Sequence, residues 1–417
     1  MIDATLPTCS LDLSDADFLR DPYPRLAELR RETPVFHDPA RRATVVLAYS
    51  TIAQILRSRR FGRSILHILS RDELGWPPPD PRQADFDRFE SSHMMSNEPP
   101  IHTRLRGVVG RAFTPKRVED LRARMAEIVT DTLDRLAGSE GFDLVGAFAE
   151  PLPVTIIGEM LGIPPARHPA LRDWSADIVR LYEPAHSETD QARANAAVVA
   201  FSAYLRDVIA ERRARPGPDL ISALVAPDET GDRLSEDELI ATCILLLNAG
   251  HEATVNGTSG AVLSLLRAPE QWQRLAEAAE MPGFDPLFKT AVDELLRYDT
   301  PLPFFERWVL EDTEIDGVSF AQGSRVALLL ASGNRDPAKF EAPDQLVLAR
   351  DPNPHLTFGL GSHFCLGAPL ARLEMQVALH GLARRFPKLR LAEPGAEPVY
   401  RPGFVIRGLA RLDVLPG

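Results

Sequence analysis

The feature that most constrains the fold is one long helical segment near the middle of the chain. Ser235-Glu-Asp-Glu238 has the S-x-x-E pattern of a capping box, in which a serine and a glutamate satisfy free N–H groups at a helix start. The helical pattern continues to about Arg267, and Pro269 follows, where a helix cannot continue. At ~1.5 Å per residue this helix is roughly 48 Å long, enough to cross a whole domain. We therefore expect a mainly helical fold.

The rest of the chain is mostly helical in pattern, with strand signals toward both ends. Helices are expected at 25–31, after the stretch 21–24, and at 102–150, 151–161, 166–181, 188–215, 269–279 and 285–298. Strands are expected at 35–36 and 44–47, as a hairpin, and at 307–310, 318–320, 325–331, 405–409 and 412–415, while the proline-rich stretch 75–81 is a loop. The predicted fold class is mainly α, helix-rich, with a small β-sheet region formed by both chain ends. No linker or compositional break divides residues 1–417, so we expect a single domain.

Charge and cysteine content exclude several classes of function. The net charge is −12, from 47 basic and 59 acidic residues, which argues against a nucleic-acid partner. Cys9, Cys243 and Cys365 have neither disulfide nor zinc spacing, and a reducing cytoplasm suits them. The N-terminus lacks a signal-peptide pattern, and no apolar run approaches the roughly 20 residues that span a bilayer. We expect a cytoplasmic protein with no membrane partner, and a monomer.

One of the three cysteines has unusual surroundings. It lies in the glycine-punctuated stretch Phe358-Gly-Leu-Gly-Ser-His-Phe-Cys365-Leu-Gly367, directly before a strong helical pattern. The positive end of a helix dipole favours the thiolate, which is the form that binds metals. Glycines let the backbone turn tightly and approach a flat ligand. This layout is expected of an axial cysteine ligand to heme iron, whereas Cys243 is expected to be an inert, buried small side chain.

The same stretch resembles the cysteine-loop signature of the cytochromes P-450, F-x-x-G-x-x-x-C-x-G. Phe358, Gly361, Cys365 and Gly367 occupy its fixed positions. The resemblance extends along nearly the whole chain and favours the soluble, bacterial type of the family. It implies the cytochrome P-450 fold and a heme b cofactor, with Cys365 as the iron ligand and Phe358, Gly359 and Gly367 beside the heme.

Further residues take their expected roles from this resemblance. Glu294-Leu-Leu-Arg297 is similar to the family's E-x-x-R motif, whose two charged residues form a buried structural network with Arg350. Four residues match the positions that contact the heme propionates, and they are His102, Arg106, Arg307 and His363.

The long helix contains the stretch Ala249-Gly-His-Glu-Ala-Thr254, which resembles the family's oxygen-activating motif A-G-x-E/D-T. Glu252 fits the acid position, but Ala253 stands where threonine is usual, and Thr254 comes one residue later. One residue is ~100° around a helix, so Thr254 cannot take over the same direction. Two hypotheses stay open for these catalytic residues. A substrate hydroxyl or a water network fed by Glu252 replaces the threonine, or the reaction depends less on ordinary proton delivery.

The substrate pocket is placed by position in the family. Its expected walls are mostly apolar, which suits a largely apolar small molecule. The residues are Met94, Met95, Leu245, Ala249, Leu302, Phe304, Phe305 and Phe404, and further candidates are Phe86, Phe89, the turn 181–184 and Val405.

The resemblance implies a heme-thiolate monooxygenase that inserts one O2-derived oxygen atom into a C–H or C=C bond. Electrons are expected from NAD(P)H through a separate ferredoxin and ferredoxin reductase, with Arg106, Arg111, Lys116 and Arg372 suited to an acidic ferredoxin. One alternative is a heme-thiolate enzyme that uses peroxide or catalyses ring coupling or desaturation, as the alanine at position 253 allows. Another is a recruitment module without heme, although such a module should lack the cysteine loop.

Overall fold

The computed structural model describes residues 6–183, 186–227 and 231–417. Within them the chain forms two compact units. The first comprises the described part of Met1–Phe61 together with Val118–Leu152 and Ala253–Gly417, and the second comprises Gly62–Arg117 and Pro153–Glu252. The prediction that residues 1–417 form a single domain stays a prediction.

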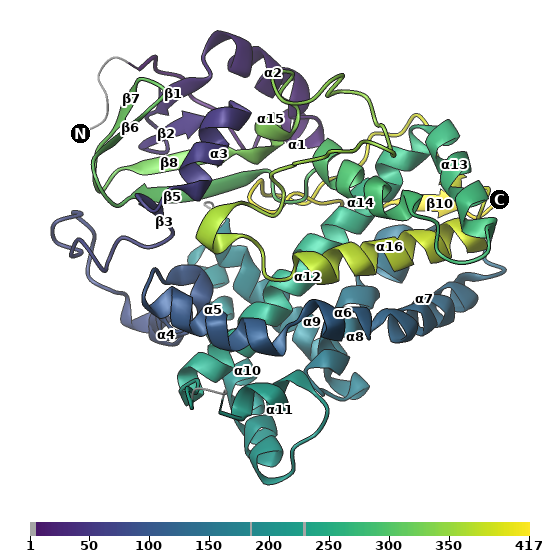
Figure 1. The fold of residues 1–417 in the computed structure, drawn as a ribbon, viewed down its shortest axis with the longest axis horizontal. Helices are drawn as coiled ribbons and strands as arrows, with labels where there is room; N and C mark the ends of the chain where they lie inside the picture. The colour runs from purple at the N-terminus through teal and green to yellow at the C-terminus, as the bar shows by residue number, and fades with distance from the viewer. Residues whose placement is uncertain (1–5, 184–185, 228–230) are drawn as a thin grey trace. The chain divides into compact units, whose positions relative to one another are not determined.

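The first unit contains the main sheet (Figure 1). Its five strands lie in the order β1-β2-β8-β5-β3, with bounds β1 Val35–Asp38, β2 Ala43–Val46, β8 Arg325–Leu329, β5 Phe304–Val309 and β3 Phe61–Gly62. The strands β1 and β2 form the predicted antiparallel hairpin, and β2 pairs in parallel with β8. The N-terminal hairpin and strands from the second half of the chain therefore share one sheet.

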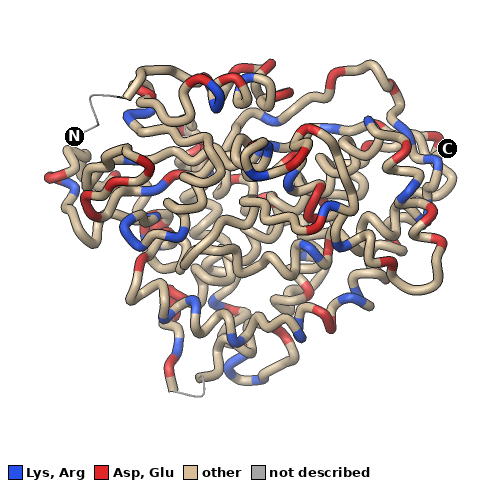
Figure 2. Tube along the Cα trace, turned by 45° about the horizontal axis from the view of Figure 1, so that its top comes forward, with Lys and Arg blue, Asp and Glu red and all other residues tan. Residues whose placement is uncertain are grey.

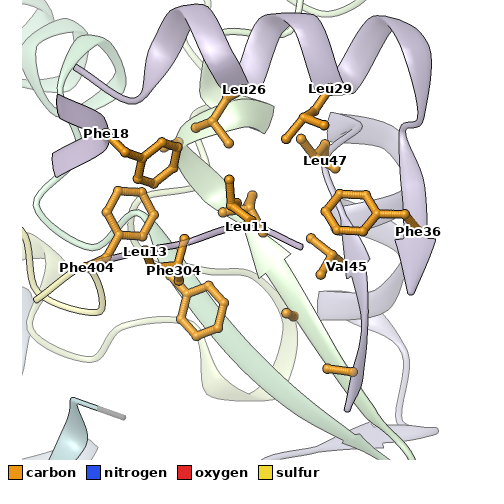
Figure 3. Packing of buried hydrophobic residues seen from close by; sticks show 14 of the residues in the cluster. Leu11, Leu13, Phe18, Leu26, Leu29, Phe36, Val45, Leu47, Phe304 and Phe404 are labelled. Atoms are coloured by element: carbon orange, nitrogen blue, oxygen red, sulfur yellow. The ribbon is translucent and has the colours of Figure 1, made fainter. Parts of the chain in front are cut away.

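Successive residues of a strand point to opposite faces of the sheet, and in this sheet both faces are buried. Val45 and its partner Ala327 belong to one apolar cluster, with Phe304 from β5. Figure 3 shows Leu26 and Leu29 of α2 (Tyr23–Glu32) over this side. On the other face, the next residues along β2 and β8 pack with α3 (Tyr49–Arg57).

Helices and short strands complete the first unit. The helices are α1 Ala16–Arg20, α7 Arg122–Leu136, α13 Pro269–Glu280, α14 Leu287–Tyr298, α15 Leu330–Asn334 and α16 Ala368–Arg385, with the π-helical turn η3 Val145–Ala149 and the 3-10 turn η6 Gly361–His363. The short strands are β4 Phe142–Asp143, β10 Asp413–Leu415 and β9 Arg390–Leu391 in one sheet, and β6 Thr313–Ile315 and β7 Val318–Phe320 in another. The helix α16 packs against α7, α13 and α14.

The second unit is helical within its described residues. Its elements are η1 Pro81–Gln83, α4 Ala84–Ser91, η2 Met94–Ser96, α5 Ile101–Ala112, η4 Pro165–Arg167, α9 His168–Val179, η5 Arg180–Tyr182, α10 Glu188–Ala214 and α11 Leu220–Val225. Helix α10 packs against α9, α11 and α4. Three helices run through the boundaries between the units, namely α6 Pro115–Glu119, α8 Pro151–Met160 and α12 Glu236–Leu266.

The long helix α12 confirms the first prediction almost to the residue. The Ser235 N–H donates to Glu238 Oε2 at 2.8 Å, and the Glu238 N–H donates to Ser235 Oγ at 3.2 Å. The predicted capping box is therefore formed, and the helix ends three residues before Pro269.

Three segments differ from the predicted elements. The expected helix 102–150 is interrupted, because Pro115 starts a new helix and Gly138 takes a φ of 87° in the turn before β4. The expected strand 325–331 ends at Leu329 and continues as α15. The expected strand 405–409 is wrong: only an isolated bridge between Tyr400 and Leu409 forms there.

Charged residues of both signs are interspersed along the chain (Figure 2). Among the residues with described positions, no helix combines the length and the apolar character needed to cross a bilayer.

Candidate functional site

The loop that carries Cys365 is held in a closed turn at the start of α16. The Cys365 N–H donates to the Phe358 carbonyl oxygen at 2.9 Å, and the Phe364 N–H donates to the Gly361 carbonyl at 3.1 Å. Cys365 itself is half-buried, and α16 begins three residues later with Gly367 as its N-cap. The thiol therefore lies at the positive end of an 18-residue helix, where negative charge on sulfur is stabilised.

Two glycines of this loop are required by backbone geometry. Gly359 and Gly361 have φ values of 66° and 73°, which side-chain-bearing residues rarely adopt. A Cβ atom at Gly361 would also lie 2.2 Å from the Leu56 carbonyl oxygen at the end of α3. A Cβ at Gly367 would lie 3.9 Å from the Cys365 Sγ, an ordinary contact. The glycines thus let the loop pack closely on α3 and leave little bulk around the sulfur.

A buried carboxylate on α14 holds the segment that leads into the loop. Glu294 is fully buried and accepts two hydrogen bonds from Arg297, at 2.7 and 2.8 Å. It also accepts from Arg350 Nε at 3.0 Å, the Val347 N–H at 2.8 Å and Asn353 Nδ2 at 3.1 Å. The three residues selected from the sequence are therefore in direct contact.

Arg297 extends this network to the backbone. It is fully buried and donates to the carbonyl oxygens of Asn334, Pro343 and Gln345 at 2.9, 2.8 and 3.2 Å. One ion pair thus fixes the chain from α15 to the approach to the cysteine loop.

A second carboxylate supports the loop and was missed from the sequence. Asp293, next to Glu294, accepts from Arg372 Nε at 2.7 Å and lies 3.1 Å from His355 Nε2. Burial raises its pKa, but the bond from His355 and the charge of Arg372 outweigh this and hold the pKa below its ordinary value. The Arg372 guanidinium also lies 4.5 Å from the Phe358 ring centroid. Arg372 is therefore paired with Asp293 while its side chain is 32% exposed, and its predicted role in ferredoxin docking stays a prediction.

The other candidate cofactor residues of the first unit lie on β5 and in the loop. Arg307 is buried, its guanidinium lies 5.6 Å from the Phe305 ring, and its Nη1 donates to the Glu306 carbonyl at 2.8 Å. Phe305 in turn packs near Gly359, where a Cβ would lie 3.5 Å from the ring. His363 is half-buried in η6. The strand β5 and the cysteine loop thus adjoin through Phe305.

In the second unit, the two cationic candidates occupy one face of α5. His102 and Arg106 are one turn apart, which places them on the same side of the helix. His102 is buried and Arg106 is half-buried.

The middle of α12 has an accessible, apolar stripe. Leu246, Gly250 and Ala253 are half-buried and Ala249 is exposed, whereas most of the surrounding helix is buried. These positions recur at i, i+3, i+4 and i+7, so they form one face of the helix. A Cβ at Gly250 would be no closer than 4.0 Å to Ile157, so neighbouring side chains do not demand the glycine. This face is open to a ligand.

The catalytic candidates relate to this stripe in different ways. Ala253 belongs to it, while Thr254 is 5% exposed and points elsewhere. Glu252 is also buried, and its Oε1 lies 3.6 Å from His251 Nδ1. The alanine, and not the neighbouring threonine hydroxyl, is therefore what the helix presents.

The expected substrate-wall residues divide into two groups. Leu302, Phe305 and Met95 are half-buried, and Met94 and Leu245 are buried with 7% and 6% exposure. Phe304 and Phe404 lie inside the apolar cluster of the first unit, near Phe18 (Figure 3). Their packing does not support a role in the substrate wall.

The remaining buried cysteine behaves as predicted from its surroundings. Cys243 on α12 is fully buried, and burial raises the pKa of its thiol to about 12. It therefore stays a neutral thiol at physiological pH.

Comparison with known proteins places this geometry in a family. Residues 77–405 match the family model described as Cytochrome P450. The chain is 39% identical to Cytochrome P450 107B1 of Saccharopolyspora erythraea over 97% of both chains. It is 35% identical to the polyketide biosynthesis cytochrome P450 PksS of Bacillus subtilis, over 95% of this chain and 96% of the relative. The crystal structure of P450BioI in complex with an acyl carrier protein ligated to hexadec-9Z-enoic acid matches with a TM-score of 0.87 and 35% identity, over 96% of this chain and 100% of that one.

The chain belongs to the cytochrome P450 family and is an oxidoreductase of the monooxygenase class. The predicted P450 fold is confirmed, and the cofactor is heme b. The residues present fit this group. A single thiol at a helix N-terminus suits an iron whose equatorial ligands come from a porphyrin, and the glycines around the sulfur admit a flat ligand.

Proposed function

We propose that this protein inserts one O2-derived oxygen atom into a C–H or C=C bond of a largely apolar small molecule. The observation that carries the proposal is the closed Cys365 loop at the N-terminus of α16, which supports a thiolate ligand to the iron. When bound, the heme supplies the oxidative chemistry. The protein's own residues hold the cofactor, orient the substrate and deliver protons.

The proposed binding residues act on different parts of the cofactor. The Cys365 thiolate would hold the iron, and Phe358, Gly359 and Gly367 shape the loop around the sulfur. The cations of Arg307 and His363, and in the second unit His102 and Arg106, are proposed to bind the propionate carboxylates, for which arginine is the preferred partner. Glu294, Arg297 and Arg350 position the loop without touching the ligand.

Proton delivery is proposed to depend on Glu252 and on a hydroxyl that the chain lacks at position 253. The accessible stripe of α12 presents the Ala253 methyl, so the missing hydroxyl must come from the substrate or from ordered water. The test is Ala253→Thr, with the ratio of product formed to NAD(P)H consumed as the readout. We expect coupling with the true substrate to fall, because the added side chain competes with substrate or water for the same space. Unchanged or improved coupling would remove support for this arrangement.

The substrate class is proposed from the apolar character of the accessible residues. Leu246, Ala249 and Ala253 on α12, with Phe305, offer carbon surface and few hydrogen-bonding groups. The relatives' names include an enzyme of polyketide biosynthesis and a complex with hexadec-9Z-enoic acid on an acyl carrier protein, and the second is a long, apolar chain. A library of such compounds should be screened for displacement of iron-bound water, read as a spin-state shift. A hit turned over under 18O2 should gain one labelled oxygen atom, and a product without label would refute the proposed reaction.

Electrons are proposed to come from NAD(P)H through a ferredoxin and its reductase. Arg111 at the end of α5 and Lys116 in α6 are exposed and suited to an acidic partner. Reversing both charges should slow electron transfer from ferredoxin and reduce its salt dependence, without changing reduction by dithionite. Equal ferredoxin kinetics in the variant would exclude this surface.

A second candidate function follows from Ala253. Because the α12 stripe lacks the expected hydroxyl, a heme-thiolate enzyme that uses peroxide, or that couples rings or desaturates, is the alternative. Turnover with hydrogen peroxide but not with ferredoxin and NAD(P)H would favour it.

A further inference from the structure

A buried polar cluster in the second unit joins two segments that are far apart in the sequence. Its centre is Glu90, near the end of α4. Glu90 Oε1 accepts a hydrogen bond from the Tyr182 hydroxyl at 2.8 Å, and Oε2 accepts from Ser96 Oγ at 2.6 Å. His93 Nε2 lies 3.4 Å from Oε1. One carboxylate thus links α4 and the turn 93–96 to η5, 92 positions along the chain.

The charge state of the cluster is well defined. Burial acts to raise the pKa of Glu90, but the charge of His93 and the hydrogen bonds from His93, Ser96 and Tyr182 lower it to about 2. Burial and the neighbouring carboxylate hold the pKa of Tyr182 well above its ordinary value, so the phenol stays protonated and donates. Glu90 is therefore an ionised acceptor, and hydrogen bonds to a charged acceptor are stronger than bonds between neutral groups.

Several contacts besides those of the Glu90 carboxylate hold α4 and the turn after it. Helix α4 has only eight residues, and an isolated helix of that length is not stable in water. Its apolar contacts come from Phe86 and Phe89, and a small surface pocket of about 70 Å³ remains where α4 meets α10 and the start of α12. Further ties are the Phe86 N–H bond to Asn195 Oδ1 on α10, at 3.0 Å, and the contact of Phe89 with the His93 ring, 4.8 Å between centroids. Asn97 Nδ2 also donates to the carbonyl oxygens of Ser91 and His93, at 2.9 and 2.8 Å. Among these contacts, the bond from Tyr182 to Glu90 is the one that joins the end of α4 and the turn after it to η5.

We propose that Glu90 is a positioning residue for substrate selection, which fixes the turn carrying Met94 and Met95 against Tyr182. The inference rests on the proposed function, in which Met94 and Met95 form part of the substrate wall. Because Met side chains are flexible and fill irregular space, the wall they form is only as well defined as its backbone. Fixing that backbone through a buried carboxylate gives the wall one shape and limits which bulky ligands pass it.

The test compares wild-type holoenzyme with Glu90→Gln and Tyr182→Phe. The probes are imidazole and 4-phenylimidazole, which bind heme iron with the same group but differ in bulk. Asp85→Asn is the matched control, since Asp85 is also an acid of α4 but pairs with Arg88 of the same helix, at 3.5 Å, and not with η5. Hydrogen exchange of residues 84–97 and 178–182 supplies a readout that does not depend on ligand binding.

We expect Glu90→Gln to raise the dissociation rate of 4-phenylimidazole about tenfold, because one or two bonds to a charged acceptor are lost. The dissociation rate of imidazole should rise less than twofold. Exchange in both segments should rise in parallel, Tyr182→Phe should show a smaller change of the same kind, and Asp85→Asn none. Equal changes for both imidazoles, or wild-type exchange and rates in Glu90→Gln, would overturn the inference. If Glu90→Gln fails to retain heme, Tyr182→Phe decides by the same criteria. Failure of the proposed function is distinguishable, because it is read from product formed under 18O2, whereas the dissociation rates and hydrogen exchange compared here do not depend on turnover.

Discussion

Replacing Glu294 by Gln tests whether its ion pair with Arg297 stabilises the fold more than an exposed pair on a helix surface does. Glu294→Gln keeps the shape of the side chain but leaves Arg297 without its partner charge and replaces an acceptor oxygen by an N–H2 donor. Glu294 accepts five hydrogen bonds, from two arginines, an asparagine and a backbone N–H. Because Glu294 and Arg297 are both fully buried, water cannot replace the lost partner. Removing one member of such a pair costs ~3–5 kcal/mol.

The magnitude can be measured in two ways. In urea, the free energy of unfolding followed by far-UV circular dichroism should fall by about 4 kcal/mol. With about 2.1 cal/mol/K of unfolding entropy per residue, the same loss lowers the Tm of this 417-residue chain by roughly 5 °C. Heme absorbance should be lost at lower urea than in the wild type, because the network holds the approach to the cysteine loop.

The control is an exposed pair with the same spacing. Arg124 Nη1 and Glu127 Oε2 on α7 are also three residues apart and lie 2.8 Å from each other, but their side chains are 50% and 63% exposed. Glu127→Gln should cost less than about 0.5 kcal/mol, since exposed pairs contribute little. A Glu294→Gln variant as stable as Glu127→Gln would refute the reasoning that burial makes this network essential.

Three further substitutions test other parts of the structure. Burial raises the pKa of Glu374 on α16 to about 8, above its ordinary value of 4.5. Between these two pH values Glu374 is protonated in the folded state and loses its proton on unfolding. The free energy of unfolding therefore falls as pH rises from about 4.5 to 8. Glu374→Gln should flatten that dependence in urea titrations and be up to roughly 3 kcal/mol more stable than wild type at pH 8, and an unchanged slope would contradict this. Gly361→Ala should lower the free energy of unfolding by more than about 3 kcal/mol and weaken heme retention, because its Cβ would meet the Leu56 carbonyl. Gly395→Ala should be nearly neutral, since no atom lies within 4 Å of the added Cβ. Equal effects of the two substitutions would exclude the steric explanation. Ser235→Ala should cost about 0.5–2 kcal/mol in urea by removing the cap of α12, and no measurable change would show that the cap is dispensable.

Much of the fold follows from local signals. The capping box at Ser235 and the proline at 269 bracket α12 because both act through the nearest backbone groups. The hairpin of β1 and β2 was likewise predicted from its apolar runs. Local signals failed at 405–409, where the β-branched residues do not join a ladder. There Arg407 is buried and donates to the Leu19 and Arg20 carbonyls at 2.7 and 2.8 Å, so tertiary contacts with the N-terminal segment set its backbone.

The candidate site likewise contains some features that a local sequence pattern predicts and some contacts that it does not. The cysteine loop and the Glu294 and Arg297 pair are close in sequence and carry recognisable spacing. The contact of Asp293 with His355 and Arg372 joins three segments that have no fixed spacing in the sequence, so no local pattern predicts it. Asp293 could have been suspected only because it is a second acid beside Glu294. The cluster around Glu90 could not be predicted from the sequence either, because it joins segments that are far apart along the chain.

The central claim is that Cys365, as a thiolate, binds the heme iron. The most direct measurement is the absorption spectrum of the reduced protein with carbon monoxide, for wild type, Cys365→His and Cys243→Ser. Cys243 is the matched control, because it is fully buried and its thiol stays protonated. Wild type and Cys243→Ser should show the red-shifted band of a thiolate-ligated heme, and Cys365→His should bind heme without it. A red-shifted band that survives in Cys365→His, or one that disappears in Cys243→Ser, would contradict the account.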